Sequence, residues 1–315
     1  MRKPTKTTVD AAAEITAFII ARIEAGTPPW KRPWTLGSSG RPLRHCGTPY
    51  TGINTLYLWA IADTCGYRSR YWMTYRQATE LGGQVRRGEP GAHSVYYSSF
   101  TKQDATGEAG QGEPKTIRFL RAYRVFNADQ IDGLPEHFRP DETPPAPIAR
   151  SDRQDAIDAF FASIPSTVRH GGDQACYDRI ADVIRLPEPN AFESADHLAS
   201  TSAHEHVHWT GHGHRLARSF GKTFGDDAYA REELVAELGA GLICADLGLA
   251  NEIHDSHASY IAHWLRILRG DKSAIISAAS KAEAAYRYLM SFAEPVSNDS
   301  NVLAAAREPS EPVAA

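Results

Sequence analysis

The five residues His-Glu-His-Val-His, numbered 204–208, have the spacing of a metal-binding helix. They satisfy the pattern HExxH with His204, Glu205 and His208. Residues four apart lie on one face of a helix, with their Cβ atoms about 6 Å apart, so both imidazoles can bind the same cation. A cation held in this way acidifies water, and Glu205 can accept the proton as the water attacks a carbonyl group. The motif therefore predicts a zinc site with Glu205 as the general base.

A third metal ligand is expected from the segment YAREELVAEL, residues 229–238. Glu233 and Glu237 are four apart and would share a helix face beside a stripe of leucines. Carboxylates that border a core stripe are costly unless they are paired or bind a metal. We predict Glu233 as the ligand, and Glu237 as a partner behind the ligands or as an alternative ligand. Glu232 fits a solvated residue in the first turn, favoured by the helix dipole.

Two histidines and one carboxylate form a ligand set typical of zinc, with manganese as an alternative occupant. The sequence HEHVHWTGHGHRL lacks a third histidine at the metzincin spacing, which favours a glutamate ligand. The alternative interpretation is a polar helix whose surface histidines include His206, His212 and His214. The glutamate-containing segment downstream makes the metal site the preferred interpretation.

The second half of the chain has strong helix signals around these residues. Helices predicted near 194–211 and 228–247 would carry the two parts of the metal site, and Gly248 would end the second. An extended segment, Tyr177–Leu186, precedes them, and a strand at the edge of a sheet beside a metal can bind an extended peptide through its backbone. Further helices are expected at 151–164, 258–269 and 275–292.

The first half combines short helices with a long hairpin. Apolar residues at helical spacing predict a helix over 9–25, and a second apolar segment predicts one over 53–62. Residues 93–100 and 116–127 resemble strands and flank a polar loop, which predicts an antiparallel hairpin with a flexible tip. The prolines of PPWKRPW, residues 28–34, exclude a regular helix or a central strand there.

The two halves differ strongly in charge. Residues 1–126 contain 18 Lys and Arg against 9 Asp and Glu, a net charge of +9, whereas residues 127–315 contain 16 against 29, a net charge of −13. Four of the six tryptophans also lie in the basic segment. Basic charge combined with aromatic side chains is typical of surfaces on which single-stranded bases stack. Without zinc-finger spacing or a helix-turn-helix, sequence-specific binding to duplex DNA is disfavoured.

We therefore predict non-specific binding of single-stranded DNA by the first half, the alternative being a basic surface without function. Most of its aromatic residues must belong to the core, Trp59 and Trp72 above all. The candidate DNA-binding residues are Trp30, Lys31, Arg32, Trp34, Tyr50, Arg68, Arg70, Tyr75, Arg76, Arg86 and Arg87.

These patterns predict an α+β protein with two domains. A basic α+β domain that binds single-stranded DNA would occupy residues 1–126, and a proline-rich linker would follow at 127–150. A mostly helical domain with the metal site would occupy 151–293, followed by a disordered tail at 294–315.

The composition indicates a globular protein. The chain has 315 residues, of which 42% are hydrophobic and 23% charged. Its longest apolar stretches are too short to span a membrane, and the N-terminus lacks the features of a secretory signal. The four cysteines are scattered without a CxxC pair, which argues against a disulfide framework. We expect a cytoplasmic protein without membrane association.

From about Ile15 to Phe292 the chain resembles the ArdC-type antirestriction proteins of conjugative plasmids. The first half is also similar to TraC-type plasmid primases, but its combination with an HExxH domain favours ArdC. The resemblance rests on GTPPWKRPW (26–34), YTGINTLYLW (50–59), WMTYRQ (72–77), VRRGEPG (85–91), YRVFNADQIDG (123–133), AHEHVHWTGHGHRLAR (203–218), YAREELVAELGAGL (229–242) and ASYIAHWLRIL (258–268).

The resemblance implies a domain that binds single-stranded DNA joined to a zincin-like metallopeptidase domain, and a role in protecting incoming plasmid DNA from host restriction. The metal-site positions of the family correspond to His204, Glu205, His208 and Glu233, all of which are present. One hypothesis is a DNA-binding protector in which the metal domain is accessory. The other is an active zinc metallopeptidase that cleaves a host protein, with the first domain directing it to DNA. A primase accessory module is disfavoured, because the sequence has no convincing acidic cluster for two-metal nucleotidyl transfer.

Overall fold

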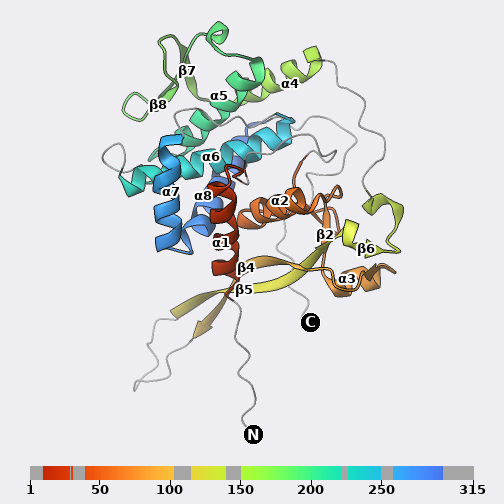
Figure 1. The fold of residues 1–315 in the computed structure, drawn as a ribbon. Helices are drawn as coiled ribbons and strands as arrows, with labels where there is room; N and C mark the ends of the chain where they lie inside the picture. The colour runs from red at the N-terminus through yellow and green to blue at the C-terminus, as the bar shows by residue number, and fades with distance from the viewer. Residues whose placement is uncertain are drawn as a thin grey trace, which may run out of the picture.

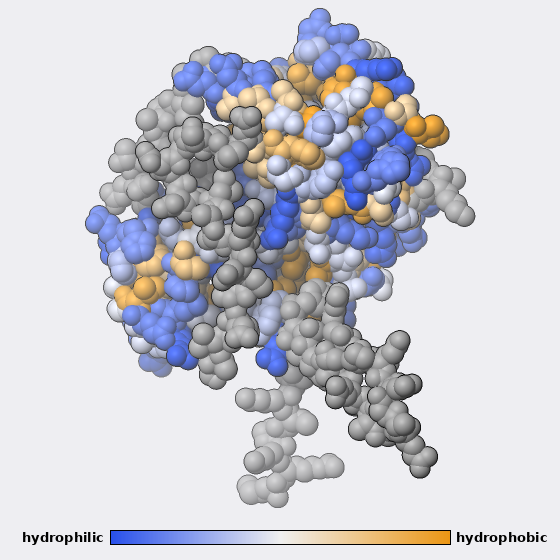
Figure 2. Space-filling view, turned by 180° about the vertical axis from the view of Figure 1, so that it is seen from behind, coloured by the Kyte–Doolittle hydropathy of each residue, from blue (hydrophilic) through white to orange (hydrophobic). Residues whose placement is uncertain are grey.

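The structure is a computed structural model, and it describes residues 10–28, 30, 40–102, 115–139, 150–220, 226–249 and 258–293. It has a helical lobe, which also carries a small three-stranded sheet, and a second lobe built around a long hairpin (Figure 1). The helices α1 and α2 of the first half lie between them. Figure 2 shows the opposite face, on which hydrophobic residues are interspersed among hydrophilic ones. The predicted α+β class, with a mostly helical second half, is confirmed.

The first half forms the two predicted helices and the predicted hairpin. Asp10 caps α1 by accepting from the backbone N–H of Ala13, and Gly66 ends α2 in the left-handed conformation that glycine adopts without strain. The hairpin strands β4 and β5 pair antiparallel from Ala92–Val125 to Lys102–Lys115, and its tip lies outside the described residues. The sheet order is β1-β2-β5-β4, with β1 parallel to β2. The bounds are α1 (Ala11–Glu24), β1 (Leu43–Arg44), α2 (Ile53–Cys65), β2 (Tyr71–Met73), β4 (Ala92–Lys102) and β5 (Lys115–Asn127).

The predicted linker at 127–150 begins with folded structure that belongs to the first half. Ile131 in β6 pairs with Val85 in β3, and Phe138 is buried in a small core with Met73. The prolines of this segment suggested a linker, but Leu134 and Phe138, on either side of Pro135, are buried. Residues 140–149 lie outside the described part of the chain. The elements are α3 (Tyr75–Glu80), β3 (Gln84–Val85), η1 (Ala128–Gln130), β6 (Ile131–Asp132) and η2 (Glu136–Phe138).

The second half is mostly helical, as predicted, with one small sheet. The predicted extended segment Tyr177–Leu186 is a hairpin of two strands, β8 and β9, because Asp182 takes a positive φ of 52° and reverses the chain. A third strand, β7, pairs parallel with β9, so the sheet order is β7-β9-β8. The elements are α4 (Arg150–Ser163), β7 (Thr167–His170), β8 (Cys176–Asp178), β9 (Val183–Leu186), η3 (Pro189–Ala191), α5 (Ala195–Thr210), α6 (Asp227–Leu247), α7 (Ala258–Gly270) and α8 (Ala274–Met290).

The two halves share one continuous hydrophobic core. Helix α6 lies at its centre and packs against α5, α7 and α8, while α1 packs on α7 and α2 on α8. Trp30 and Trp264 meet edge to face across this junction, with ring centroids 5.9 Å apart. The predicted tail at 294–315 lies outside the described residues. Among the helices that the structure describes, none combines the length and apolar character that a membrane span requires.

The contact between α5 and α6 generates the first prediction. A Cβ at Gly239 would lie 2.7 Å from Cγ2 of Val207, a branched side chain that is rotationally restricted in a helix. Although alanine is favoured over glycine within helices by about 1 kcal/mol, Gly239→Ala should lower the free energy of unfolding by about 1–3 kcal/mol, because the two helices must separate.

Denaturant unfolding measures this change. The control is Gly270→Ala at the last position of α7, where a Cβ would meet nothing within 4 Å. The tight packing is contradicted if Gly239→Ala proves as stable as the wild type.

Candidate metal centre

Two neighbouring helices bring the three predicted ligands together. His204 and His208 lie one turn apart on α5, which begins at the N-cap Ser194, and Glu233 lies on the facing side of α6. The Nε2 atoms of the histidines are 3.1 Å apart, and the two carboxylate oxygens of Glu233 lie 3.5 Å and 3.4 Å from Nε2 of His204 and His208 respectively. All three side chains are buried, and one ligand atom from each lies within 4.8 Å of the others.

The other nitrogen of each imidazole faces a second carboxylate. Nδ1 of His204 lies 3.2 Å from Oε1 of Glu237, and Nδ1 of His208 lies 3.3 Å from Oε1 of Glu232. An imidazole that donates from Nδ1 leaves its Nε2 lone pair for a metal and is held in a fixed orientation. This geometry places Glu237 behind His204 and leaves Glu233 as the carboxylate that faces both Nε2 atoms.

Glu232 is not the solvated residue of a first turn that the sequence suggested. It is only 3% exposed and accepts from Arg218, whose Nη2 lies 2.7 Å from Oε1 and whose Nε lies 3.0 Å from Oε2. Arg218 also donates to the backbone oxygen of Val207 and to Oγ1 of Thr210, at the end of α5. The sequence signal for this contact was a basic residue, Arg218, ten positions after His208. Its partner Glu232 could not be identified without the three-dimensional arrangement.

The surrounding carboxylates control the protonation of the site. Burial alone lowers the pKa of a histidine, but the hydrogen bonds that His204 donates to Glu233 and Glu237 outweigh it and hold the pKa of His204 well above its ordinary value. The pKa of His208 rises to about 9 despite burial, because Glu233 and Glu232 stabilise the imidazolium. Burial raises the pKa of the Glu233 carboxyl, but the two histidines lower it by more, so that this pKa lies below its ordinary value. The cluster therefore favours positive charge at its centre, which a divalent cation can supply in place of protons.

Glu205, the predicted general base, lies beside the predicted ligands. It lies between His204 and His208 on α5 and is 6% exposed. Strand β8 packs against α5, the helix that carries Glu205, and burial and then the Glu205 carboxylate raise the pKa of the Cys176 thiol in β8. Strand β8 is at the edge of its sheet, whereas β9 is internal. Only the first part of the predicted extended segment Tyr177–Leu186 therefore forms an edge strand.

His206, the middle histidine of the motif, points away from the ligands and is not the surface residue of the alternative interpretation. It is 1% exposed, and its Nε2 lies 2.9 Å from Oγ of Ser166 while Nδ1 lies 2.7 Å from the backbone oxygen of Ser202. Burial lowers its pKa to about 4, so it is neutral near pH 7. His206 therefore anchors α5 to the segment before β7.

Two of the predicted DNA-binding aromatics belong to the core. Trp30 is 2% exposed and packs against Trp264, and Tyr50 is 2% exposed with Arg44 over its ring at 4.8 Å. Neither ring is open for a base to stack on, because the junction of the two halves covers Trp30 and the fold of the first half covers Tyr50. Both assignments are wrong for this conformation. Lys31, Arg32 and Trp34 lie outside the described residues.

Five other candidates are exposed and lie around α3, β3 and η1. Tyr75 is 51% exposed, and its hydroxyl accepts from Gln84 of β3. The backbone N–H of Arg68 and the side chain of Arg86 both bond to Asp129 in η1, which brings these two arginines together. Arg70 is half-buried and donates to the backbone oxygen of Arg41. The exposed set is Arg68, Tyr75, Arg76, Arg86 and Arg87, in which Arg76 pairs with Glu80, and Arg86 with Glu89 and Asp132.

The two halves match two different protein families. Residues 9–126 match the N-terminal domain of the anti-restriction factor ArdC, and residues 155–281 match the zincin-like metallopeptidases. The crystal structure of metal-free antirestriction ArdC from plasmid R388 superposes with a TM-score of 0.76 at 43% identity, covering 90% of this chain and 98% of that one. Its Mn(II)-bound crystal structure gives a TM-score of 0.75 at 42% identity, covering 91% and 99%.

Relatives of known sequence extend this similarity. The uncharacterized protein y4eC of Sinorhizobium fredii is 40% identical, over 88% of this chain and 91% of its own length. A DNA primase TraC of Escherichia coli is 36% identical over 89% of this chain, but the match spans only 27% of the primase.

The raised histidine pKa values predict how metal affinity depends on pH. Because the pKa of His208 is about 9 without metal, binding at pH 7 must displace its proton. Affinity for Zn²⁺ or Mn²⁺ should therefore rise between pH 6.5 and 9, by about tenfold per pH unit for each proton displaced. Calorimetry in buffers of different ionisation enthalpy measures the protons released.

The matched variant is Glu232→Gln, which removes a carboxylate that raises the pKa of His208. It should bind metal with a flatter pH profile. Equal affinity of the wild type at pH 6.5 and 9 would show that His208 is not protonated in the metal-free protein.

Proposed function

Because the chain belongs to the ArdC family of antirestriction proteins, we propose that it binds single-stranded DNA without sequence preference and protects entering plasmid DNA from host restriction during conjugation. The observation that carries this proposal is its similarity over almost the full length of antirestriction ArdC from plasmid R388. Such a protein acts in the cytoplasm, on DNA that has just entered the recipient cell.

The exposed arginines around η1 support a role in DNA binding. Arg68 and Arg86 both bond to Asp129, the exposed Arg87 follows Arg86 in the chain, and Tyr75 offers an exposed ring that contacts Gln84 of β3. Arginines contact the phosphate backbone whatever the sequence, and exposed rings stack on bases of any kind. The net positive charge of residues 1–126 adds a long-range attraction for a polyanion.

The metal-binding residues suit zinc, with manganese as the alternative. His204, His208 and Glu233 would hold the ion, and Glu237, Glu232 and Arg218 would fix the orientation of these ligands. When bound, the metal would supply a Lewis acid that polarises a carbonyl group and acidifies water. Glu205 is the carboxylate placed to accept and return a proton.

A second candidate function is an active zinc metallopeptidase that cleaves a host protein, with the first half directing it to DNA. The complete set of His204, Glu205, His208 and Glu233 favours this alternative. Among the described strands β8 has a partner on one side only, and it packs against α5, so its other edge could bind an extended peptide as a further strand.

Titration of a fluorescent oligothymidylate and a matched duplex with the full chain tests the DNA proposal. We expect tighter binding of the single strand and a steep loss of affinity with salt, with a slope of about −0.7 in log K against log salt for each phosphate contacted. The full chain is needed, because the two halves share one core. A flat salt response, or binding of the duplex alone, would refute the proposal.

Glu205→Gln separates the two candidate functions. The change removes the general base but keeps all three ligands, so metal content should stay near that of the wild type. If DNA binding alone protects, plasmid transfer into a restricting host should be unchanged. Glu233→Gln, which alters a ligand, is the control for loss of metal. A fall in transfer with Glu205→Gln, seen in restricting but not in non-restricting recipients, would favour the peptidase.

A further inference from the structure

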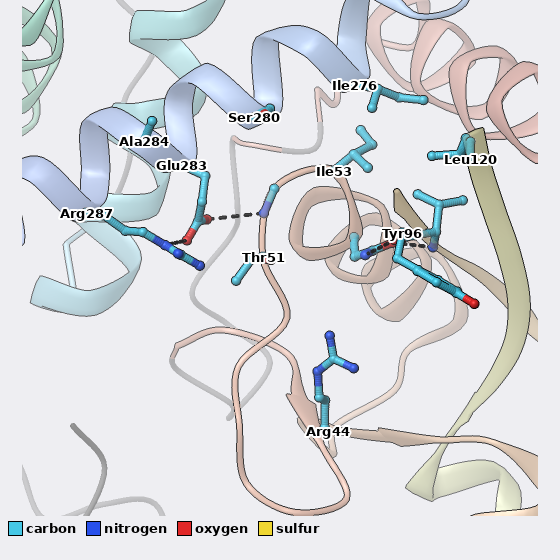
Figure 3. A pocket seen from close by; sticks show the side chains of 13 residues that line it. Arg44, Thr51, Ile53, Tyr96, Leu120, Ile276, Ser280, Glu283, Ala284 and Arg287 are labelled. Atoms are coloured by element: carbon cyan, nitrogen blue, oxygen red, sulfur yellow. Dashed lines mark hydrogen bonds and ion pairs between the residues drawn. The ribbon is translucent and has the colours of Figure 1, made fainter. Parts of the chain in front are cut away.

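A cavity of about 440 Å³ lies between the two halves of the chain (Figure 3). Its walls come from β1, the N-terminus of α2 and the β4–β5 hairpin on one side, and from α8 of the metallopeptidase-like half on the other. The volume falls within the range of about 300–1,000 Å³ typical of sites for small ligands. Neither half encloses this space without the other.

The cavity carries an excess of positive charge. Arg44 and Arg287 line it, and Glu283 is the one acidic residue among the described side chains of the lining. The Glu283 carboxylate is already neutralised by buried Arg41, whose Nη1 and Nη2 each lie 3.2 Å from one of its oxygens, and it also accepts from the backbone N–H of Gly52. The exposed Arg287 also donates to Glu283, with Nε 3.0 Å from Oε1. Three arginines, Arg41, Arg44 and Arg287, therefore surround one carboxylate, and this excess of positive charge can attract an anion.

The opposite wall offers an aromatic ring and apolar side chains. Tyr96 of β4 is 37% exposed and lies with Leu120 of β5 on one side of the cavity, while Glu283 and Arg287 lie on the other (Figure 3). Ile53 and Ile276 add apolar surface between them. A cavity lined by a partly exposed aromatic ring and by two arginines has the groups that a planar base joined to a phosphate requires.

We propose that this cavity binds one nucleotide unit of a single DNA strand, with its phosphate at Arg44 and Arg287 and its base against Tyr96. The proposal rests on the proposed binding of single-stranded DNA and assigns part of that binding to α8. The DNA site then extends across the junction, so that the strand contacts the metallopeptidase-like half directly.

Arg287→Gln in the full chain tests the contribution of α8. The substitution leaves Glu283 held by Arg41 and Gly52, so the fold should persist, which circular dichroism and thermal unfolding would verify. The matched control is Arg266→Gln on α7: the Arg266 side chain is 62% exposed and that of Arg287 is 65%, and each forms one ion pair with a carboxylate. We expect Arg287→Gln to weaken binding of a fluorescent oligothymidylate about tenfold and to reduce the salt slope by about 0.7, with no change for the control.

Tyr96 gives an independent readout of base stacking. Tyr96→Leu should weaken the same binding about fivefold or more, and Tyr96→Phe should retain it. If the wild type binds the oligonucleotide but the Arg287 and Tyr96 variants bind equally well, this inference fails and the proposed function stands. If the wild type does not bind single strands at all, the proposed function fails first. Saturable binding of thymidine monophosphate that does not compete with the oligonucleotide would show a site for a free nucleotide and overturn the assignment to a strand.

Discussion

The balance of buried charge between α5 and α6 is the constraint on which the second half depends. Two imidazoles face the carboxylates of Glu232, Glu233 and Glu237, and among the described side chains around them Arg218 supplies the permanent cation. Removing one member would leave another charge buried without compensation, which is far more costly than losing the pair together. The packing of Gly239 against Val207 keeps the helices close enough for these contacts. The geometry of the predicted ligands, the spacing of α5 and α6 and the protonation of the cluster therefore depend on one another.

A second buried ion pair connects that arrangement to the first half. Arg41 bonds Glu283 through both oxygens and lies over the ring of Tyr286, whose hydroxyl donates to Asp246 near the end of α6. The same Glu283 accepts from the N-terminus of α2. Since α6 also carries Glu233, a continuous series of packed helices, α2, α8 and α6, connects the β4–β5 hairpin to the predicted metal ligands.

Much of the metal centre could be predicted from the sequence because its spacing is local. The histidines and Glu205 lie within one turn and a half of helix, and the ends of α5 and α6 follow from capping residues such as Ser194 and Gly248. The partners of Glu232 and the burial of Trp30 depend on residues up to hundreds of positions away, and composition does not contain that information. The folded residues after Asn127 were missed for a related reason, since their partner strand, β3, lies more than forty positions earlier.

The edge-to-face contact of Trp30 with Trp264 bears on how such chains evolve. A recombination point between residues 127 and 150 would separate the two rings and expose both sides of a common core, so the two halves are constrained to be inherited together. The similarity to TraC is in keeping with this constraint, since it extends across 89% of this chain within a much longer protein. The two halves are therefore expected to pass between longer proteins as one unit.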